Sequence, residues 1–236
     1  MREVLQRVFR HLPYRYLLLY AGVLLASLYV FAELAGEVFE KERFAFDAPL
    51  LVWFHGLVSP PVTALALGLT FIGSVYVLAP LGIVLLALLW RRSRRAAVFF
   101  ALGFGGAVAL NLVVKAFFAR VRPDLFAQLS PESSFSFPSG HTMGSTAFFL
   151  ALFLIVRQLM PRWQGWMALL GLVLTLGIGL SRLYLQVHYP SDILAAWALS
   201  SAWVLGLNVW YARLGRGRVE EAQGNSKGGQ TDKIGP

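Results

Sequence analysis

Apolar stretches long enough to cross a membrane as helices recur along this sequence, and each contains at most one charged residue. A helix needs about 20 mostly apolar residues to span the hydrocarbon core of a bilayer. The chain of 236 residues is 57% hydrophobic and 14% charged, whereas soluble domains carry about 25% charged residues. We therefore predict an all-α, polytopic membrane protein with six transmembrane helices in one bundle. The predicted spans are residues 16–35, 62–90, 96–114, 142–159, 164–181 and 192–212.

The second span is preceded by an apolar segment that we expect to lie in the membrane interface. Residues 48–90 contain no Asp, Glu, Lys or Arg, but Ser59-Pro60-Pro61 interrupts the run, and paired prolines mark a break between elements. Only the part after the prolines is expected to cross. The first span follows a basic N-terminus, as in a signal peptide, but no small-x-small cleavage site is evident near Gly36, so we expect a retained span.

Basic residues predict the orientation of the bundle. They gather at every second boundary between predicted spans, and the positive-inside rule places such clusters in the cytoplasm. The clusters are Arg2, Arg7, Arg10 and Arg15; Arg91, Arg92, Arg94 and Arg95; Arg157 and Arg162; and Arg213, Arg216 and Arg218. We expect a multi-pass protein of the cell (inner) membrane, with both termini cytoplasmic and with loops 36–61, 115–141 and 182–191 outside.

Charge and composition bound the remaining features of the chain. The net charge of +9 does not indicate nucleic-acid binding, because the basic residues form short clusters between apolar runs instead of one basic face. The absence of cysteine excludes thiol catalysis. We expect one six-span domain over residues 1–214 and a disordered cytoplasmic tail over 215–236, which lacks apolar periodicity. The acidic first outer loop is expected to be a solvated connector, and the sequence does not indicate an oligomeric state.

The second outer loop begins with two cations that we expect to share a helix face. Lys115 and Arg122 lie nearly two helical turns apart at the end of the third predicted span. Pro123 disfavours helix at Arg122, so both cations are expected on the last turns, facing the outer loop. Arg120 is off this face and is expected to contact solvent or lipid headgroups. Taken alone, such a pair also fits an interfacial anchor.

The sequence Pro138-Ser139-Gly140-His141 stands directly before the fourth predicted span. Ser139 can cap that helix, and Gly140 lets the backbone approach a ligand closely. Free amide groups and the positive end of the helix dipole together can bind a phosphate. Taken alone, the tetrapeptide also fits a Ser-capped helix start with an incidental histidine.

The third outer loop carries Arg182, His188 and Asp192 around Pro190. Pro190 suits the first turn of the sixth helix, which places Asp192 in that turn and His188 just before it. The carboxylate can then accept the proton-bearing nitrogen of His188, fix the tautomer and leave the other nitrogen free to attack. A structural His–Asp contact is the alternative if the segment is taken alone.

The three segments together indicate phosphoryl transfer. Ionisable residues at the edge of a membrane bundle are costly, so a cluster supplied by separate loops marks a functional site. Three cations and a helix N-terminus can hold three phosphate oxygens, one oriented histidine can attack phosphorus, and a second can protonate the leaving oxygen.

In order and spacing, these segments resemble the complete tripartite signature of the type 2 phosphatidic acid phosphatase superfamily. The resemblance implies a metal-independent membrane phosphatase without a cofactor, acting through a phosphohistidine. It implies that His188 is the nucleophile, that Asp192 orients it, and that His141 is the general acid and later the base. The phosphate would be bound by Lys115, Arg122, Ser139, Gly140 and Arg182. The soluble vanadium-dependent haloperoxidases of the same superfamily are disfavoured by a chain this apolar.

A metal-dependent hydrolase and a transporter are the alternative functions for this set of residues. His141, His188 and Asp192 could supply three metal ligands, but the converging cations Lys115 and Arg122 would repel a divalent ion. A transporter would carry its polar residues at the midplane, whereas these lie at span ends on one side. The expected substrate is a lipid phosphate or diphosphate in the bilayer, of the polyprenyl diphosphate, phosphatidylglycerol phosphate or phosphatidic acid type; a soluble phosphate ester is the alternative. The motifs do not choose among these lipids.

Overall fold

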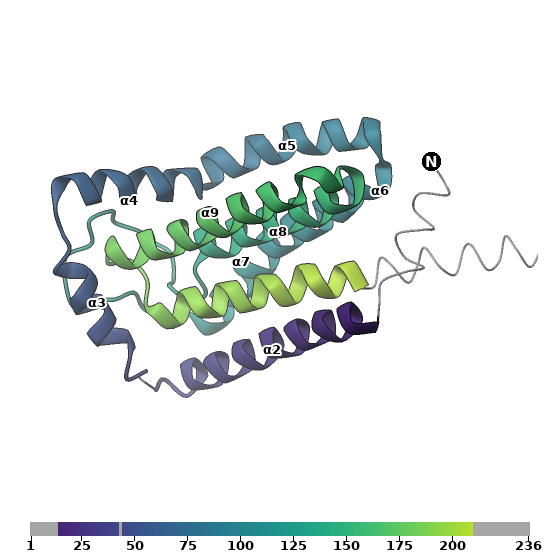
Figure 1. The fold of residues 1–236 in the computed structure, drawn as a ribbon. Helices are drawn as coiled ribbons and strands as arrows, with labels where there is room; N and C mark the ends of the chain where they lie inside the picture. The colour runs from purple at the N-terminus through teal and green to yellow at the C-terminus, as the bar shows by residue number, and fades with distance from the viewer. Residues whose placement is uncertain (1–13, 43, 210–236) are drawn as a thin grey trace, which may run out of the picture.

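The computed structural model describes residues 14–42 and 44–209, which form a bundle of helices (Figure 1). Within these residues, six helical segments are long and apolar enough to cross a membrane. They are Leu18–Phe39, Pro60–Arg92, Arg94–Phe118, Gly140–Leu159, Pro161–Tyr184 and Pro190–Val209. The predicted all-α architecture is therefore confirmed. The predicted end of the sixth span at residue 212 and the tail over 215–236 lie outside the described residues.

The second span is built from two helices that meet at a glycine. Helices α4 (Pro60–Ile72) and α5 (Val75–Arg92) are separated by Gly73 and by Ser74, whose backbone is extended. A Cβ at Gly73 would lie 2.6 Å from Cγ2 of Ile178 in helix α9 (Gln164–Tyr184), closer than side-chain carbons pack. Glycine at this position therefore lets the break in the span pack directly against α9.

The third span is also composite. Ser93 caps helix α6 (Arg94–Phe100) by accepting a 3.3 Å hydrogen bond from Ala96 N. A π-helical turn, η1 (Ala101–Gly105), joins α6 to helix α7 (Gly106–Phe118). Such turns form where a side chain or a neighbour interrupts the regular hydrogen-bond ladder, and here Trp203 Nε1 donates to the carbonyl of Leu102 at 3.0 Å.

A short helix, α3 (Asp47–His55), stands where the interfacial segment was predicted. It exposes Leu50, Val52 and Trp53 and is tied to the bundle by Gln186, whose Nε2 donates to the carbonyl of Leu51 at 3.1 Å. The position of α3 in the membrane interface remains a prediction.

Helix α8 (Gly140–Leu159) and the span Pro190–Val209 form the centre of the bundle. Of the residues in their apolar stretches, 67% and 61% are buried. Helix α2 (Tyr14–Phe39) runs along one side of the bundle, beside the span Pro190–Val209 (Figure 1). A short turn, η2 (Pro161–Trp163), links α8 to α9. Side chains on the two central helices are therefore held by protein contacts on most sides.

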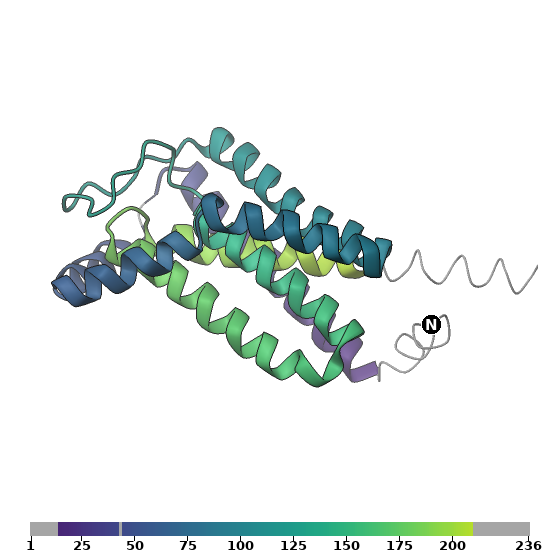
Figure 2. The same ribbon diagram turned by 90° about the horizontal axis from the view of Figure 1, so that it is seen from above.

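The connections that carry the sequence motifs gather at one end of the bundle. The long connection between α7 and α8, the turn after α9 and helix α3 all lie at this end in both views (Figures 1 and 2). The second and third predicted outer loops therefore meet in space, as the sequence indicates.

Candidate active site

The structure brings the predicted site residues together at this end of the bundle. Lys115 lies on the last turn of α7, and Arg122 follows in the connection to α8. Gly140 and His141 are the first residues of α8, and Arg182 lies in the last turn of α9. His188 lies in the turn after α9, and Asp192 is the third residue of the span Pro190–Val209. Six separate segments of the chain thus contribute to one cluster.

The predicted common helix face of Lys115 and Arg122 is wrong. Helix α7 ends at Phe118, because Ala119 adopts a left-handed conformation with φ of 45°. Arg122 therefore approaches from a loop. Its Nε donates to the carbonyl of Ser134 at 2.7 Å, and its Nη1 donates to the carbonyl of Val187 at 2.6 Å. The arginine connects the loop between α7 and α8 to the turn after α9.

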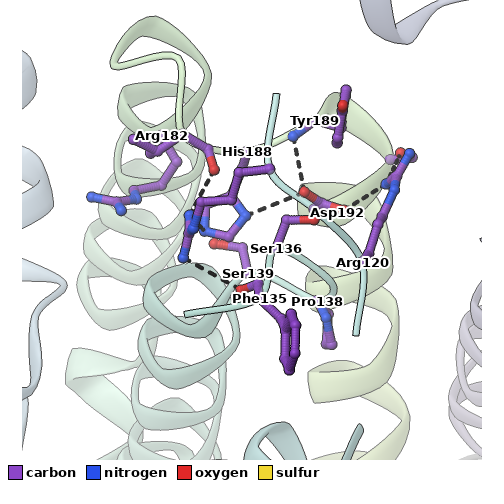
Figure 3. A network of polar contacts seen from close by, with 12 residues as sticks. Arg120, Phe135, Ser136, Pro138, Ser139, Arg182, His188, Tyr189 and Asp192 are labelled. Carbon is purple, nitrogen blue, oxygen red and sulfur yellow. Dashed lines mark hydrogen bonds and ion pairs between the residues drawn. The ribbon is translucent and has the colours of Figure 1, made fainter. Parts of the chain in front are cut away.

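His188 and Asp192 form the predicted contact (Figure 3). A second contact, with Arg122, identifies the tautomer of His188. Nδ1 of His188 lies 3.2 Å from Oδ2 of Asp192, and Nε2 lies 3.2 Å from Nη1 of Arg122. A guanidinium group can only donate hydrogen bonds, so Nε2 must be the unprotonated nitrogen. Nδ1 then carries the proton and donates a hydrogen bond to Asp192. The free lone pair of the ring therefore faces the cations.

The surroundings of His188 keep its ring neutral. The side chain is 1% exposed, and burial, followed by the charges of Arg122, Arg182 and Lys115, holds the pKa of His188 well below its ordinary value. Burial and nearby cations both disfavour the protonated form. The ring is thus kept in its neutral form, as the predicted role of nucleophile requires.

The other cations are held by the connection between α7 and α8. Lys115 Nζ donates to the carbonyl of Phe135 at 2.7 Å and to Oγ of Ser134 at 3.2 Å. Arg182 Nη1 donates to Oγ1 of Thr70 in α4, and its Nη2 donates to Oε1 of Glu132 at 2.5 Å. All three cations therefore stand around one region, as a phosphate-binding cluster requires.

Ser139 occupies the predicted N-cap position of α8 but does not make the predicted cap contact. Its side chain accepts no hydrogen bond from the first turn of backbone amides. Oγ of Ser139 instead accepts a 3.0 Å hydrogen bond from Oγ1 of Thr142, and its backbone N–H donates to the carbonyl of Asp192 at 3.3 Å. The orphan amides of the helix start remain available to an anion.

Gly140 is required by a neighbouring side chain. A Cβ at this position would lie 3.1 Å from Oδ1 of Asn111, and Nδ2 of Asn111 donates to the carbonyl of Pro138 at 3.1 Å. Asn111 lies one turn before Lys115 in α7, so it joins the start of α8 to the helix that carries this lysine. His141 is partly buried and within electrostatic range of Glu132, Arg182 and Lys115.

The predicted contact of Arg120 with solvent or lipid headgroups is wrong. Nη1 of Arg120 lies 2.6 Å from Oδ1 of Asp192, and Nη2 lies 3.0 Å from Oδ2 of Asp47. The first outer loop is therefore more than a solvated connector, because Asp47 reaches the site. The helix-face argument failed for Arg120 because α7 ends before it. The position of Arg120 between Lys115 and Arg122 could have indicated that it belongs to the site.

Glu132 was also missed. Its carboxylate contacts Arg182 at 2.5 Å and lies 3.9 Å from Arg122. Burial opposes ionisation of Glu132, but Arg182 and Arg122 outweigh it and hold the pKa of this carboxyl below its usual value. An acid in a loop whose partners are motif cations could have been suspected, but no spacing pointed to it.

The chain is similar in sequence and fold to known proteins. The family model of the PAP2 superfamily matches residues 96–216. The chain is 35% identical over 136 residues to phosphatidylglycerophosphatase B of Bacillus subtilis, a match covering 56% of this chain and 66% of that one. It is 28% identical over 201 residues to an undecaprenyl-diphosphatase of Sulfolobus acidocaldarius, covering 83% and 90%. The crystal structure of a transmembrane PAP2-type phosphatidylglycerolphosphate phosphatase from Bacillus subtilis superimposes with a TM-score of 0.72 at 27% identity, covering 79% and 94%.

Proposed function

Because this chain belongs to the PAP2 superfamily, we propose that it is an integral membrane phosphatase that hydrolyses a lipid phosphate or diphosphate through a phosphohistidine at His188. The observation that carries the proposal is the orientation of the His188 ring. Asp192 accepts a hydrogen bond from Nδ1, and the unprotonated Nε2 is turned toward Arg122. A phosphate held by that arginine would present its phosphorus to the nucleophile.

Substrate binding uses the cations and the start of α8. Arg122, Arg182 and Lys115 bind the phosphoryl oxygens, together with backbone amides around Ser139 and Gly140. Their donors now contact loop atoms and Glu132, and phosphate oxygens take over part of these contacts. The positive charges offset the charge that develops on the transferred group, which is the main contribution a protein makes to phosphoryl transfer.

The reaction then proceeds in two displacements. Nε2 of His188 attacks phosphorus, and the bond from phosphorus to the leaving oxygen breaks. His141, whose protonated form is favoured once the negative phosphate offsets the cations, gives that oxygen its proton. The phosphorylated ring is stabilised by its Nδ1–H contact with Asp192. In the second displacement His141 takes a proton from water, the water oxygen attacks phosphorus, and the bond between Nε2 and phosphorus breaks. Phosphate leaves, and His141 is again protonated.

The place of the site in the bundle supports a lipid substrate. Lys115 lies in the last turn of the third span, and Gly140 begins the fourth. The fifth span ends at Tyr184 and the sixth begins at Pro190. The site is thus at one boundary of the apolar slab, where lipid headgroups are concentrated. The relatives named above act on phosphatidylglycerophosphate and undecaprenyl diphosphate, and we propose a substrate of this class.

The experiment that tests this function compares phosphate release from long-chain lipid phosphates and from chainless analogues, with the purified enzyme in bilayers. We expect a much higher kcat/KM for long chains, because the remote chain contributes binding and positioning. Equal kcat/KM values would favour a soluble phosphate ester. Activity lost in a chelator and restored by added zinc or magnesium would favour the His/Asp metal alternative.

We also propose that the site faces the extracytoplasmic side of the cell (inner) membrane and that both termini are cytoplasmic. The basic clusters at alternate span boundaries support this orientation. The chain has no cysteine, so single cysteines give clean labelling. We expect a cysteine at Gln128 to react with an impermeant reagent in intact cells and one at Lys227 not to react. The reverse pattern would overturn the orientation.

A further inference from the structure

Arg120 is held between two carboxylates from distant parts of the chain. Its Nη1 donates to Oδ1 of Asp192 at 2.6 Å, and its Nη2 donates to Oδ2 of Asp47 at 3.0 Å. The side chains of Arg120, Asp47 and Asp192 are 15%, 6% and 0% exposed. Asp192 in turn accepts a hydrogen bond from Nδ1 of His188. An unbroken chain of polar contacts therefore leads from Asp47 in α3 to the proposed nucleophile. Figure 3 shows its part from Arg120 through Asp192 to His188.

Asp47 also holds the start of the helix that carries Asp192. Oδ1 of Asp47 accepts the backbone N–H of Ser191 at 2.9 Å, and Oδ2 accepts the hydroxyl of Ser191 at 2.6 Å. Ser191 is the second residue of the span Pro190–Val209, so its amide has no partner within that helix. Asp47 thus caps, from another segment, the turn that presents Asp192.

Resting on the proposed role of His188 as nucleophile, we propose that Asp47 and Arg120 are positioning residues that hold Asp192 in place and keep its negative charge effective toward the His188 ring. Neither residue touches the reacting atoms. Arg120 fixes the free oxygen of the Asp192 carboxylate, while the other oxygen faces the ring. Asp47 fixes both Arg120 and the backbone beside Asp192.

The charge of Asp47 is as important as its contacts. Attack by Nε2 leaves a positive charge on the phosphorylated ring, which Asp192 must stabilise. With Arg120 alone at 2.6 Å, the charges of the arginine and Asp192 would cancel. With Asp47 included, the two carboxylates and one guanidinium group carry a net charge of −1. Buried charges interact strongly in a medium of low polarity, so this balance affects the rate of both displacements.

The shape of Arg120 suits it to this task. Its planar guanidinium group uses one terminal nitrogen for each carboxylate, which a lysine cannot do. The group lies over the ring of Tyr189, 4.2 Å from its centroid, and Nη1 also donates to Oγ of Ser191 at 2.8 Å. Contacts on both terminal nitrogens and on one face of the guanidinium group therefore hold Arg120 in place.

The test measures kcat, KM and vanadate affinity for Asp47→Asn, Arg120→Lys and the double variant Asp47→Asn/Arg120→Gln. We expect Asp47→Asn to lower kcat by about 10- to 100-fold, with KM and vanadate affinity changed by less than about 3-fold because the phosphate contacts remain. Arg120→Lys should show the same pattern. The double variant should recover part of the kcat lost in Asp47→Asn, since it removes the unbalanced cation. Asp124→Asn, an exposed acid in the same connection, is the charge-matched control and should leave kcat unchanged.

Two results would overturn the inference. Wild-type kcat in both single variants would mean that the contacts of Asp47 and Arg120 stabilise the loops without affecting catalysis. Loss of kcat in the double variant at least as large as in Asp47→Asn, together with a matching fall in melting temperature, would mean that the pair is purely structural. His188→Ala measured alongside separates these failures from failure of the proposed function. If that variant keeps turnover, the function itself is wrong; if it is inactive while Asp47→Asn is normal, only the positioning role falls.

Discussion

Helices α2 and α8 have similar compositions and opposite surroundings. Their mean hydropathies are 1.9 and 1.5, yet 6% of the residues in the apolar stretch of α2 are buried against 67% in α8. Helix α8 packs against α5, α6, α7 and α9. Gly140, Gly144, Ala147 and Ala151 recur every three or four residues along α8, which places them on one face. Small residues let helices approach closely in a membrane, and an added Cβ at Gly103 of η1 would lie 3.3 Å from that of Ala151.

This difference shows where the bundle is rigid. Helix α8 begins with the residues proposed to bind phosphate, and the equally central span Pro190–Val209 begins with the turn that contains Asp192. Both are packed by protein along most of their length. Helix α2, with Leu18, Leu25 and Tyr29 more than half exposed, presents apolar side chains outward, as a boundary with lipid requires. The chemistry is thus placed on the helices whose positions are most strongly determined by packing.

The largest expected difference between substitutions at the site and substitutions in α2 is in catalytic activity. His188→Ala should lower turnover by at least about 10³-fold, because loss of a covalent nucleophile removes the reaction pathway. His141→Ala should still form the phosphoenzyme from a substrate with a good leaving group, but should fail with poor ones. Leu25→Ala in α2 should leave kcat near the wild-type value. A phosphoenzyme trapped on His188→Ala would show that another residue is the nucleophile.

A smaller effect is expected on stability. Leu154 in α8 is 1% exposed and Leu25 in α2 is 65% exposed. Leu154→Ala leaves a cavity and should lower the free energy of unfolding by roughly 2–5 kcal/mol, whereas Leu25→Ala should change it by less than about 0.5 kcal/mol. Unfolding of both variants in the same detergent micelles measures this difference. Equal losses would mean that burial in the isolated bundle does not describe its packing in lipid.

The spans were predictable because hydropathy and helix length are properties of local sequence. The proximity of Arg182, His188 and Asp192 was predictable because they lie close together in sequence, in the turn before Pro190 and on either side of it. Ser139 and His141 are likewise close in sequence, at the start of α8. Hydropathy could not distinguish α2 from α8, because both satisfy the requirement for crossing a bilayer.

The missed contacts share a physical origin. Asp47 meets Arg120 and Ser191 across 73 and 144 positions, and Glu132 meets Arg182 across 50. Such pairs depend on how loops from separate spans meet, which no local pattern encodes. The early end of α7 has the same character. Pro123 predicted a break near Arg122, but the helix ends at the left-handed Ala119, so the arginines reach their partners from a loop.

The smallest expected effect concerns Glu132, the charged group at the margin between the buried centre and the exposed connection. Its side chain is 28% exposed, and its carboxylate contacts Arg182, where a phosphate oxygen is proposed to bind. Because the pKa of Glu132 lies below its usual value, the carboxylate is ionised at neutral pH and competes with the substrate. Glu132→Gln should therefore tighten vanadate binding and lower KM by about 3- to 10-fold, the scale of a partly exposed ion pair, with kcat changed by less than about 2-fold. Arg182 keeps its contact with Thr70 in this variant, so the guanidinium group has a second anchor. Glu42→Gln, an exposed acid of the first outer loop, controls for the change in net charge. Weaker vanadate binding in Glu132→Gln would mean that Glu132 holds Arg182 in its binding position instead of competing for it, and the rigid part of the site would then extend into the exposed connection.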